Sequence, residues 1–219
     1  MSDRGFWIEP AVFQPAECDA LIDTLSGLSR SRAGVRHLMS NPVVAAAAND
    51  TRMLPIARRG IGKTAVPFRA TLFEKTGAKN WLIAWHQDTA LPLESKFDAA
   101  GWGPWSEKGG VLYAHAPSWA LSRVIALRLH LDASTSENGP LRVIPDSHRA
   151  GILSDDEVLK QANESESEVC PVGRGGVLAM RPLLIHSSSK AVLGNPRRVL
   201  HIEYADSLEL SPGVRLAIA

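Results

Sequence analysis

Short apolar stretches separated by turn residues occupy most of the chain after residue 65 and predict a protein built mainly of strands. The stretches are rich in β-branched and aromatic residues, and turns such as Glu137-Asn138-Gly139-Pro140 separate them. The predicted strands are Phe68–Glu74, Trp81–Asp88, Val124–Leu131, Leu141–Ile144, Gly176–Arg181 and Arg198–Tyr204. They do not alternate with helices, so the pattern favours an antiparallel β-sandwich or barrel with helices packed outside.

Three segments have the features of helices. The first begins at Pro15, because proline suits a first turn and an apolar stripe with helical spacing follows it. The stripe consists of Cys18, Leu21, Ile22, Leu25 and Leu28. A shorter helix is predicted from Val43 to Ala48, and a third begins at Ser154, which forms a capping box with Glu157.

The segment Thr89–Arg123 departs from the strand pattern. It carries Trp102, Trp105, Tyr113 and Trp119 among Gly and Pro residues and reads as a loop insertion. Loops of this length in a compact domain are usually lids, binding loops or disordered segments. We therefore predict a lid at 89–123, with Trp102 and Trp105 as candidate substrate contacts.

Composition limits the number of domains and the kinds of partner. The chain has 219 residues, 45% of them hydrophobic, which is enough for one well-buried core and marginal for two. We therefore expect residues 1–219 to form one domain. The charge is nearly balanced, with 24 Lys and Arg against 23 Asp and Glu, so the whole-chain basic field that recruits nucleic acid is absent.

Cysteine usage and hydropathy indicate the compartment. Two cysteines, Cys18 and Cys170, cannot build a disulfide framework or a cysteine-based zinc site. The first residues lack a basic region followed by an apolar stretch, and no apolar run approaches the roughly 20 residues that cross a bilayer. We expect a soluble, cytoplasmic protein with no membrane partner. The sequence does not indicate the oligomeric state.

His86 and Asp88 stand two residues apart at the end of a predicted strand. On a regular strand they share one face with Leu82 and Ala84, and the small alanine leaves room behind them. An imidazole and a carboxylate so placed can reach one metal ion, and His186, one hundred residues after His86, supplies a third ligand. Two histidines and one carboxylate leave three positions of an octahedral ion open, the arrangement that suits non-haem Fe(II) oxygenases.

Arg197 follows His186 by eleven residues, at the start of the next predicted strand. 2-Oxoglutarate chelates iron through its 2-oxo acid end, and its distal carboxylate then needs a buried cation. Arginine suits this role because its planar fork grips a carboxylate with two hydrogen bonds. Ser188 and Lys75 are candidates for further contacts to the co-substrate, whereas Arg198 should point away from the pocket.

Several motifs occur together along the chain. They are Trp85-His86-Gln87-Asp88, the segment 137–149 that ends in Ser147-His148-Arg149, His186 with Arg197-Arg198, and the opening Gly5–Phe13 followed by Pro15–Leu25. In this combination the chain resembles the phytanoyl-CoA dioxygenase family from about Gly5 to Asp206. The resemblance implies a double-stranded β-helix (a cupin-like jelly roll), mainly β with flanking helices. It also implies Fe(II) bound by His86, Asp88 and His186, with 2-oxoglutarate anchored by Arg197.

The resemblance also has details that bear on chemistry. The family often has glycine where this chain has Asp146, a difference that affects a turn. Related enzymes that halogenate have a small residue in place of the metal-binding carboxylate. The presence of Asp88 therefore indicates a hydroxylase or another oxidative variant.

The sequence thus predicts an Fe(II)/2-oxoglutarate-dependent dioxygenase that uses O2 to hydroxylate a C–H bond of a small molecule, with release of succinate and CO2. Further candidate substrate contacts are Arg128, His130 and His201. A cupin-type metal protein with other chemistry, such as an isomerase or a dioxygenase that does not use 2-oxoglutarate, is one alternative, but it would not need Arg197. A non-enzymatic jelly-roll binding module is the other and would bind no metal.

Overall fold

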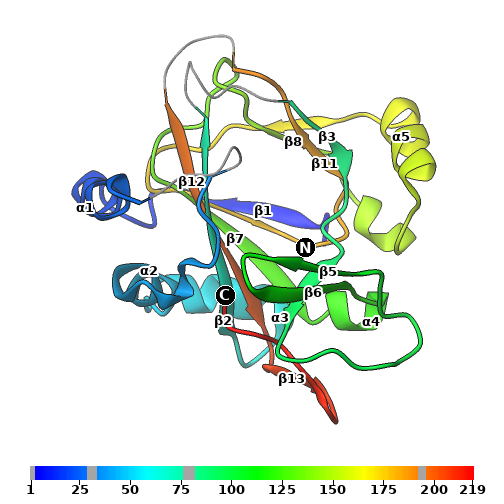
Figure 1. The fold of residues 1–219 in the computed structure, drawn as a ribbon. Coiled ribbons are helices and arrows are strands. Elements are labelled where there is room, and N and C mark those ends of the chain that lie inside the picture. The colour runs from blue at the N-terminus through cyan, green and yellow to red at the C-terminus, as the bar shows by residue number, and fades with distance from the viewer. Residues whose placement is uncertain (1–2, 29–33, 76–81, 192–195) are drawn as a thin grey trace.

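Two antiparallel sheets form the centre of the computed structural model, which describes residues 3–28, 34–75, 82–191 and 196–219 (Figure 1). The five-stranded sheet runs β1 (Phe6–Glu9), β10 (Val177–Met180), β7 (Val124–His130), β12 (Arg197–Ala205) and β2 (Val66–Lys75). The four-stranded sheet runs β3 (Ile83–His86), β11 (His186–Ser188), β8 (Leu141–Val143) and β9 (Glu168–Cys170). Apolar residues of both sheets share one buried cluster, so the sheets face each other as the predicted double-stranded β-helix.

All six predicted strands are present, although their ends differ from the prediction. The strand predicted as Trp81–Asp88 is the least accurate: β3 ends at His86, and Trp81 lies outside the described residues. The sequence analysis missed β1, β9 and β11, which have four, three and three residues. Strands this short are held by pairing with their neighbours and carry too few residues for a periodic pattern.

The two faces of the five-stranded sheet differ in chemistry. Along β12, Leu200 and Ile202 point to one face and join the main hydrophobic cluster, together with Leu127 and Leu129 of β7. The alternate positions of β12 are Arg197, Val199, His201 and Glu203, and all four are buried on the opposite face. Side-chain alternation therefore gives the sheet an apolar outer face and a polar inner face, which looks toward the four-stranded sheet.

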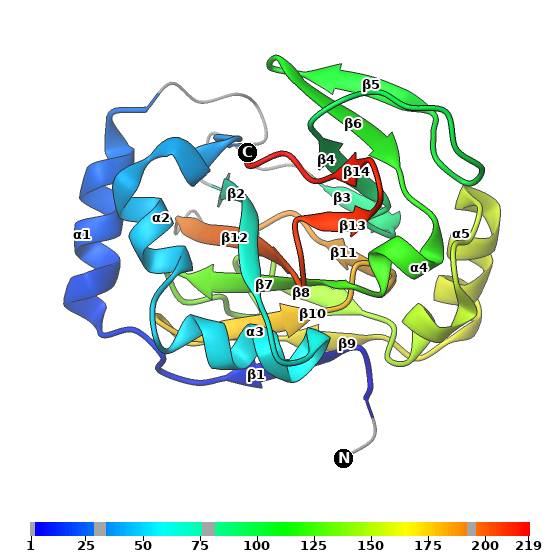
Figure 2. The same ribbon diagram turned by 90° about the horizontal axis from the view of Figure 1, so that it is seen from below.

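Helices cover the apolar face, as Figure 2 shows for α1 (Pro15–Ser26), α2 (Pro42–Ala48) and α3 (Met53–Ile61). The first two were predicted; α3 was not, because its start has no capping residue and Pro55 lies within it. The predicted capping box of Ser154 and Glu157 is present at α5 (Asp155–Glu164), which packs beside β3. There are also two short 3-10 helices, η1 (Leu38–Ser40) and η2 (Ser147–Ala150). None of the described helices has the length and apolar character needed to cross a membrane.

The prediction of a loop at Thr89–Arg123 is wrong. This segment forms a three-stranded antiparallel sheet of β4 (Ala90–Leu93), β6 (Val111–His115) and β5 (Trp105–Lys108), followed by α4 (Ser118–Leu121). Gly109 and Gly110, both at positive φ, make the two-residue turn between β5 and β6. Glycine pairs of this kind mark a hairpin, and reading the segment by its overall Gly and Pro content concealed that signal. A second hairpin, β13 (Glu209–Ser211) and β14 (Val214–Arg215), lies near the C-terminus.

Asp146 occupies the turn at which the resemblance described above led us to expect glycine. Its φ is 64°, in the left-handed region that favours glycine and, less strongly, aspartate. The substitution therefore preserves the turn, at a modest conformational cost. It leaves the Ser147 hydroxyl in place to accept a hydrogen bond from the Ile185 backbone N–H at 2.8 Å, next to His186.

Candidate functional site

His86, Asp88 and His186 lie together at one edge of the four-stranded sheet. His86 and His186 are directly opposite each other on the paired strands β3 and β11, and their ring centroids are 4.1 Å apart. Asp88 follows β3, and its backbone N–H donates to the Pro182 carbonyl at 2.9 Å, which fixes the position of its side chain. One ligand atom from each of the three residues lies within 4.8 Å of the others. The predicted triad is therefore assembled in space.

The strand that carries His86 is not regular, and the expected shared face with Leu82 and Ala84 is wrong. The register of β3 against β11 shifts between His186 and Ser188, which marks an irregularity in the pairing. As a result Ile83, and not the exposed Ala84, lines the cavity beside His86. Gln87 fixes the next turn, because its amide donates to the Gly151 and Leu183 carbonyls, each at 2.8 Å.

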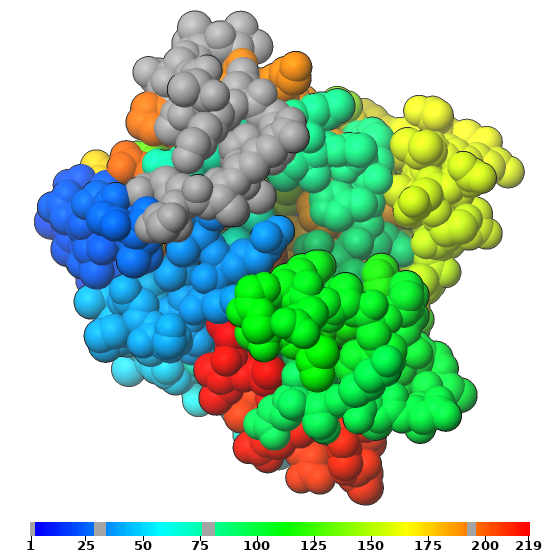
Figure 3. Space-filling model, viewed as in Figure 1, coloured from blue at the N-terminus to red at the C-terminus, as the bar shows by residue number. Residues whose placement is uncertain are grey.

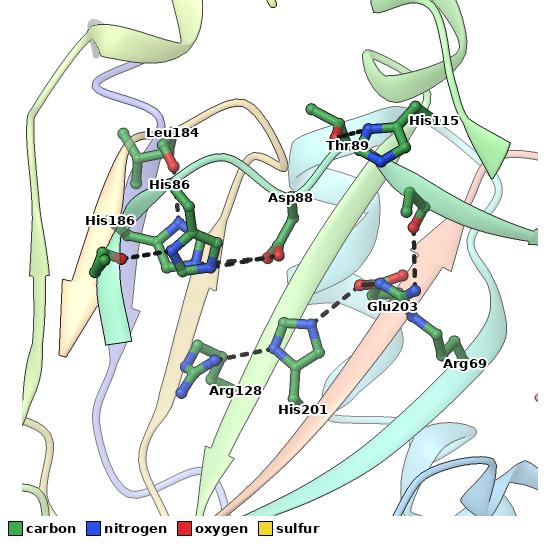
Figure 4. A network of polar contacts seen from close by, with 12 residues as sticks. Arg69, His86, Asp88, Thr89, His115, Arg128, Leu184, His186, His201 and Glu203 are labelled. Atoms are coloured by element: carbon green, nitrogen blue, oxygen red, sulfur yellow. Dashed lines mark hydrogen bonds and ion pairs between the residues drawn. The ribbon is translucent and has the colours of Figure 1, made fainter. Parts of the chain in front are cut away.

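Hydrogen bonds orient both imidazoles for metal binding. The Nδ1 atom of His86 lies 2.9 Å from the Ala84 carbonyl, and Nδ1 of His186 lies 2.9 Å from the Leu184 carbonyl. A carbonyl only accepts, so each Nδ1 carries the proton and each Nε2 has a free lone pair. These Nε2 atoms lie 3.8 Å and 3.6 Å from the Asp88 carboxylate oxygens. Figure 4 shows both rings directed toward this carboxylate. All three donors thus point toward one location between them.

The protonation states also suit a metal. Burial, followed by the nearby His86, lowers the pKa of His186 below its usual value. Burial alone would raise the pKa of Asp88, but the neighbouring His186 and His86 hold it below the usual range of a carboxyl. A neutral imidazole and an ionised carboxylate are the forms that ligate metals. The donor set of two nitrogens and one carboxylate oxygen therefore fits Fe(II).

The triad opens into a cavity of about 320 Å³ between the two sheets. Figure 3 shows the surface hollowed where the segment around residue 36, strand β3 and the β5–β6 hairpin meet. The floor comes from the polar inner face of the five-stranded sheet, and the hairpin supplies one wall. Floor residues include Thr71, Phe73, Arg128, Arg197 and His201.

Arg197 lines this cavity while its side chain is almost wholly buried, with 2% of its surface exposed. Its Nε and Nη1 atoms have no hydrogen-bond partner, and no described carboxylate forms an ion pair with it. Burial, and then the nearby Arg128, lower the pKa of Arg197 to about 9. Its neighbour Arg198 points to the other side and pairs with Asp132 at 2.7 Å, as strand alternation predicted. A buried cation without a counter-ion suits an anionic ligand.

Ser188 and Lys75, the other predicted co-substrate contacts, bond to each other. The Lys75 ammonium donates to the Ser188 hydroxyl at 2.7 Å, and that hydroxyl donates to the Gly139 carbonyl at 2.9 Å. Gly139 has a φ of +72°, and a Cβ there would lie 2.4 Å from the Ser189 carbonyl oxygen. Neither Ser188 nor Lys75 lines the cavity. Their arrangement holds the end of β11 next to Arg197, and a direct contact to the co-substrate stays a prediction.

A chain of polar contacts crosses the cavity floor (Figure 4). Arg128 Nη1 lies 3.1 Å from His201 Nδ1, and His201 Nε2 lies 3.1 Å from a Glu203 oxygen, which also pairs with Arg69. Because Arg128 can only donate, His201 accepts at Nδ1 and donates from Nε2. Arg69 in turn donates to the Ala90 carbonyl at 3.1 Å. The network ties β7, β12 and β2 to the start of β4.

The remaining candidate substrate residues lie away from the cavity. His130 is on the inner face but 1% exposed, and it does not line the cavity. Burial, and then Arg128 and Arg197, lower its pKa well below the usual value, so it is neutral. Trp102 and Trp105 pack edge-on against Phe97, with ring centroids 5.3 Å and 5.2 Å apart, and do not line the cavity either. Substrate contact by these three residues stays a prediction that the geometry does not favour.

The sequence analysis missed several residues that line the cavity. They are Arg36, Arg69, Thr71, Phe73, Thr89 and Lys108. Two signals were available: the inner-face alternation of β2, which places Arg69, Thr71 and Phe73 together, and the Gly109-Gly110 turn, which defines the hairpin. Arg36 has no local signal, because only tertiary packing brings it to the cavity.

Comparison with known proteins places this geometry in context. The structure is similar to that of EctD from S. alaskensis with bound Fe, with a TM-score of 0.71, 19% identity, and coverage of 99% of this chain and 84% of that chain. It is also similar to HygX from Streptomyces hygroscopicus with nickel and 2-oxoglutarate bound (TM-score 0.66, 19% identity, 93% and 84% coverage). A third similar structure is the non-heme alpha ketoglutarate dependent epimerase SnoN from nogalamycin biosynthesis (TM-score 0.68, 15% identity, 94% and 79% coverage). At these identities the likeness establishes the shared fold.

Sequence comparison gives the family. A search of curated protein sequences finds no match. The profile of the phytanoyl-CoA dioxygenase family, in contrast, matches residues 1–199. That range includes the whole triad and Arg197, and the chain therefore belongs to the phytanoyl-CoA dioxygenase family.

Proposed function

We propose that this protein is an Fe(II)/2-oxoglutarate-dependent dioxygenase that hydroxylates a C–H bond of a small molecule. The observation that carries the proposal is the convergence of two features on one cavity. They are a three-ligand face and a buried arginine with no counter-ion among the described residues. The triad alone would suit many metal proteins. The arginine supports chemistry in which a carboxylate of a chelating co-substrate binds beside the metal.

Each residue has a distinct task in this proposal. His86, Asp88 and His186 hold the metal by one face and leave the cavity side for other ligands. Arg197 grips the distal carboxylate of 2-oxoglutarate, so that the 2-oxo acid end is directed to the metal. When bound, iron and 2-oxoglutarate supply oxidising power from O2: one oxygen atom enters the substrate C–H bond, and the other enters succinate as CO2 leaves.

The protein's own residues orient and shield this chemistry. His186 is 4% exposed, whereas the side chains of His86 and Asp88 are 37% and 33% exposed toward the cavity. A ligand in the cavity therefore covers the open side of the triad and excludes water from it. The Arg128–His201–Glu203 contacts fix the floor against which the co-substrate and the substrate are positioned.

The similar structures support the cofactors in this proposal. One of them holds iron, and another holds nickel together with 2-oxoglutarate. The third is named as an epimerase, so hydroxylation has to be separated from other oxidative outcomes by the mass of the product. An isomerase that ignores 2-oxoglutarate would form no succinate.

We also propose that the segment 89–123 gates the cavity through the β5–β6 hairpin. The hairpin contributes Lys108, Tyr113 and His115 to the cavity wall, whereas Trp105 of β5 and the preceding Trp102 pack elsewhere. Retaining the hairpin but shortening its tip should therefore change substrate turnover more than it changes iron binding.

The test of the proposed activity uses purified protein with Fe(II), ascorbate and 2-oxoglutarate. Iron content is measured by elemental analysis, and succinate by chromatography. The wild type should bind one iron per chain and form succinate slowly without substrate. His186→Ala should do neither, while His148→Ala, at a histidine outside the cavity, should do both. Wild-type iron content in His186→Ala would refute the assignment.

A further inference from the structure

The charges that line the cavity are unbalanced. Among the described lining residues, the cations are Arg36, Arg69, Lys108, Arg128 and Arg197, and the only carboxylate is Asp88. Glu203, which lies behind the floor, compensates Arg69 through their ion pair. The cavity therefore carries a strong excess of positive charge, which favours anionic ligands.

The metal and the co-substrate of the proposed function would remove only part of this excess. The two charges of Fe(II) would be matched by Asp88 and by the chelating carboxylate of 2-oxoglutarate. The distal carboxylate would be matched by Arg197. Among the described residues, Arg36 and Lys108 at the mouth would remain without a counter-ion, and Arg128 would retain its contacts with His201 and the Phe73 ring, neither of which is a carboxylate.

Arg36 and Lys108 come from separate parts of the chain and meet at the mouth. Lys108 is the last residue of β5, directly before the Gly109-Gly110 turn, and its ammonium lies 5.0 Å from the centre of the Tyr113 ring. The Arg36 guanidinium has no hydrogen-bond or ion-pair partner among the residues that the structure describes. Burial, followed by Arg36 and Arg69, lowers the pKa of Lys108, whereas Asp88 raises it. Lys108 thus stands within the electric field of both the second cation and the triad.

Contacts between the two segments hold these cations in place. His37, next to Arg36, has a left-handed backbone with φ of 60°, and its Nε2 lies 3.0 Å from the Tyr113 hydroxyl. A Cβ added at Gly109 would lie 3.2 Å from the His37 ring. The tip of the hairpin is therefore packed closely against the Arg36–His37 segment. The backbone positions that carry the two cations are therefore held next to each other at the mouth.

We propose that Arg36 and Lys108 bind an anionic group, a carboxylate or a phosphate, on the substrate of this enzyme. This inference rests on the proposed function and specifies the substrate class of the same site. The anion would sit at the mouth between the hairpin tip and residue 36, and the rest of the substrate would extend inward to the triad. A cavity of about 320 Å³ is at the small end of ligand sites, so a substrate that shares it with the co-substrate is itself small.

The two cations are poor candidates for anchoring 2-oxoglutarate itself. Both are exposed, whereas Arg197 is buried on the floor and has unpartnered nitrogens. A charge-assisted pair is stronger where water is excluded, so the floor is the better place for the co-substrate carboxylate. The mouth is left for the substrate.

The experiment measures binding to the Fe(II)- and 2-oxoglutarate-loaded protein without oxygen, so that no turnover occurs. Four probes share one chain length: hexanoate, hexyl phosphate, hexanamide and hexan-1-ol. By calorimetry, at least one of the two anions should bind the wild type at least tenfold more tightly than either neutral probe. The Arg36→Gln/Lys108→Gln double variant should lose this preference, whereas Lys63→Gln, at an exposed lysine outside the cavity, should retain it.

Three results would overturn the inference. The first is equal affinity of the wild type for anionic and neutral probes, and the second is an unchanged anion preference in the double variant. The 2-oxoglutarate affinity of the double variant is measured alongside; a loss as large as that for the anions would assign the two cations to the co-substrate and also overturn it. Failure of the wild type to bind iron or form succinate refutes the proposed function instead, so the two failures are distinct.

Discussion

Replacing Arg197 with methionine should abolish most of the affinity for 2-oxoglutarate and leave the metal centre intact. Methionine has an unbranched apolar side chain that can replace the methylene stem of arginine. The change therefore removes mainly the charge and the hydrogen-bond donors. In the structure, Arg197 is 2% exposed and its Nε and Nη1 atoms have no partner. Its nearest charged neighbours include Arg128, a like charge, so nothing but an incoming anion would compensate it.

The expected size of the effect follows from the burial of this charge. Removing one partner of a buried, charge-assisted pair costs about 2–5 kcal/mol, which is about 30-fold to several thousand-fold in Kd. At a 2-oxoglutarate concentration one hundred times the wild-type Kd, ligand binding stabilises the folded state by about 2.7 kcal/mol. For a protein of this size, that corresponds to a rise of about 5–10 °C in Tm. Arg197→Met should show almost none of this rise.

Calorimetry and thermal unfolding of the Fe(II)-loaded protein under anaerobic conditions measure both quantities. Without 2-oxoglutarate, Arg197→Met should be at least as stable as the wild type, because an uncompensated buried charge has been removed. The matched control is Arg198→Met, which breaks the outward ion pair with Asp132 and should leave 2-oxoglutarate affinity unchanged. Wild-type affinity in Arg197→Met, or an equal loss in Arg198→Met, would refute the assignment of Arg197 as the anchor.

Three further predictions concern the metal, the buried lysine and the hairpin segment. His86→Ala should remove bound iron, as measured by elemental analysis, while the circular dichroism of the metal-free fold stays that of the wild type. Burial, and then Arg197 and Arg128, lower the pKa of Lys75 to about 7, so the unfolded chain binds more protons than the folded one between about pH 7 and 10. The unfolding free energy of the ligand-free protein should therefore rise by about 1–3 kcal/mol from pH 7 to pH 9.5 in denaturant titrations. Lys75→Met should flatten this rise. The same pH dependence of the unfolding free energy in the variant as in the wild type would contradict the argument. Trp102→Ala should lower the unfolding free energy by about 1–3 kcal/mol, because two aromatic contacts are lost; an unchanged Tm with impaired substrate turnover would instead favour a gating role for Trp102.

The long elements were predictable from sequence because each has enough residues for a regular spacing of buried side chains to be recognised. β7 and β12 alternate along seven and nine residues, and α1 keeps an apolar stripe over three turns. The sequence also singled out the triad and Arg197, and the structure brings all four residues to one cavity. Their binding of a metal and a co-substrate stays a prediction. Spacing along the chain does not give the three-dimensional geometry of the site. The irregular pairing of β3, for example, places Ile83 at the cavity in place of Ala84.

The mouth of the cavity shows why the rest was not predictable. Its residues come from the segment before η1 and from the tip of a hairpin about seventy residues later in the chain. Nothing in the local sequence near Arg36 indicates a cavity. Lys108 was concealed by the reading of 89–123 as a loop, although the Gly109-Gly110 pair at positive φ marks a hairpin turn. Contacts between distant segments are fixed by packing and have no signature in a single sequence.

The five-stranded sheet explains how a cavity with so many buried charges is compatible with a stable fold. Burying cations without counter-ions is unfavourable, and on the inner face Arg128 and Arg197 are held this way. The same strands bury their alternate side chains, among them Leu129 and Leu200, beneath α1, α2 and α3. Because successive residues of a strand face opposite sides, the stabilising face and the ligand-binding face belong to the same strands. Outer-face substitutions should therefore act on the stability of the ligand-free fold. Substitutions on the inner face should act mainly on how strongly bound anions stabilise the fold. Because the two faces have these separate roles, we expect that ligand binding and folding can be perturbed separately.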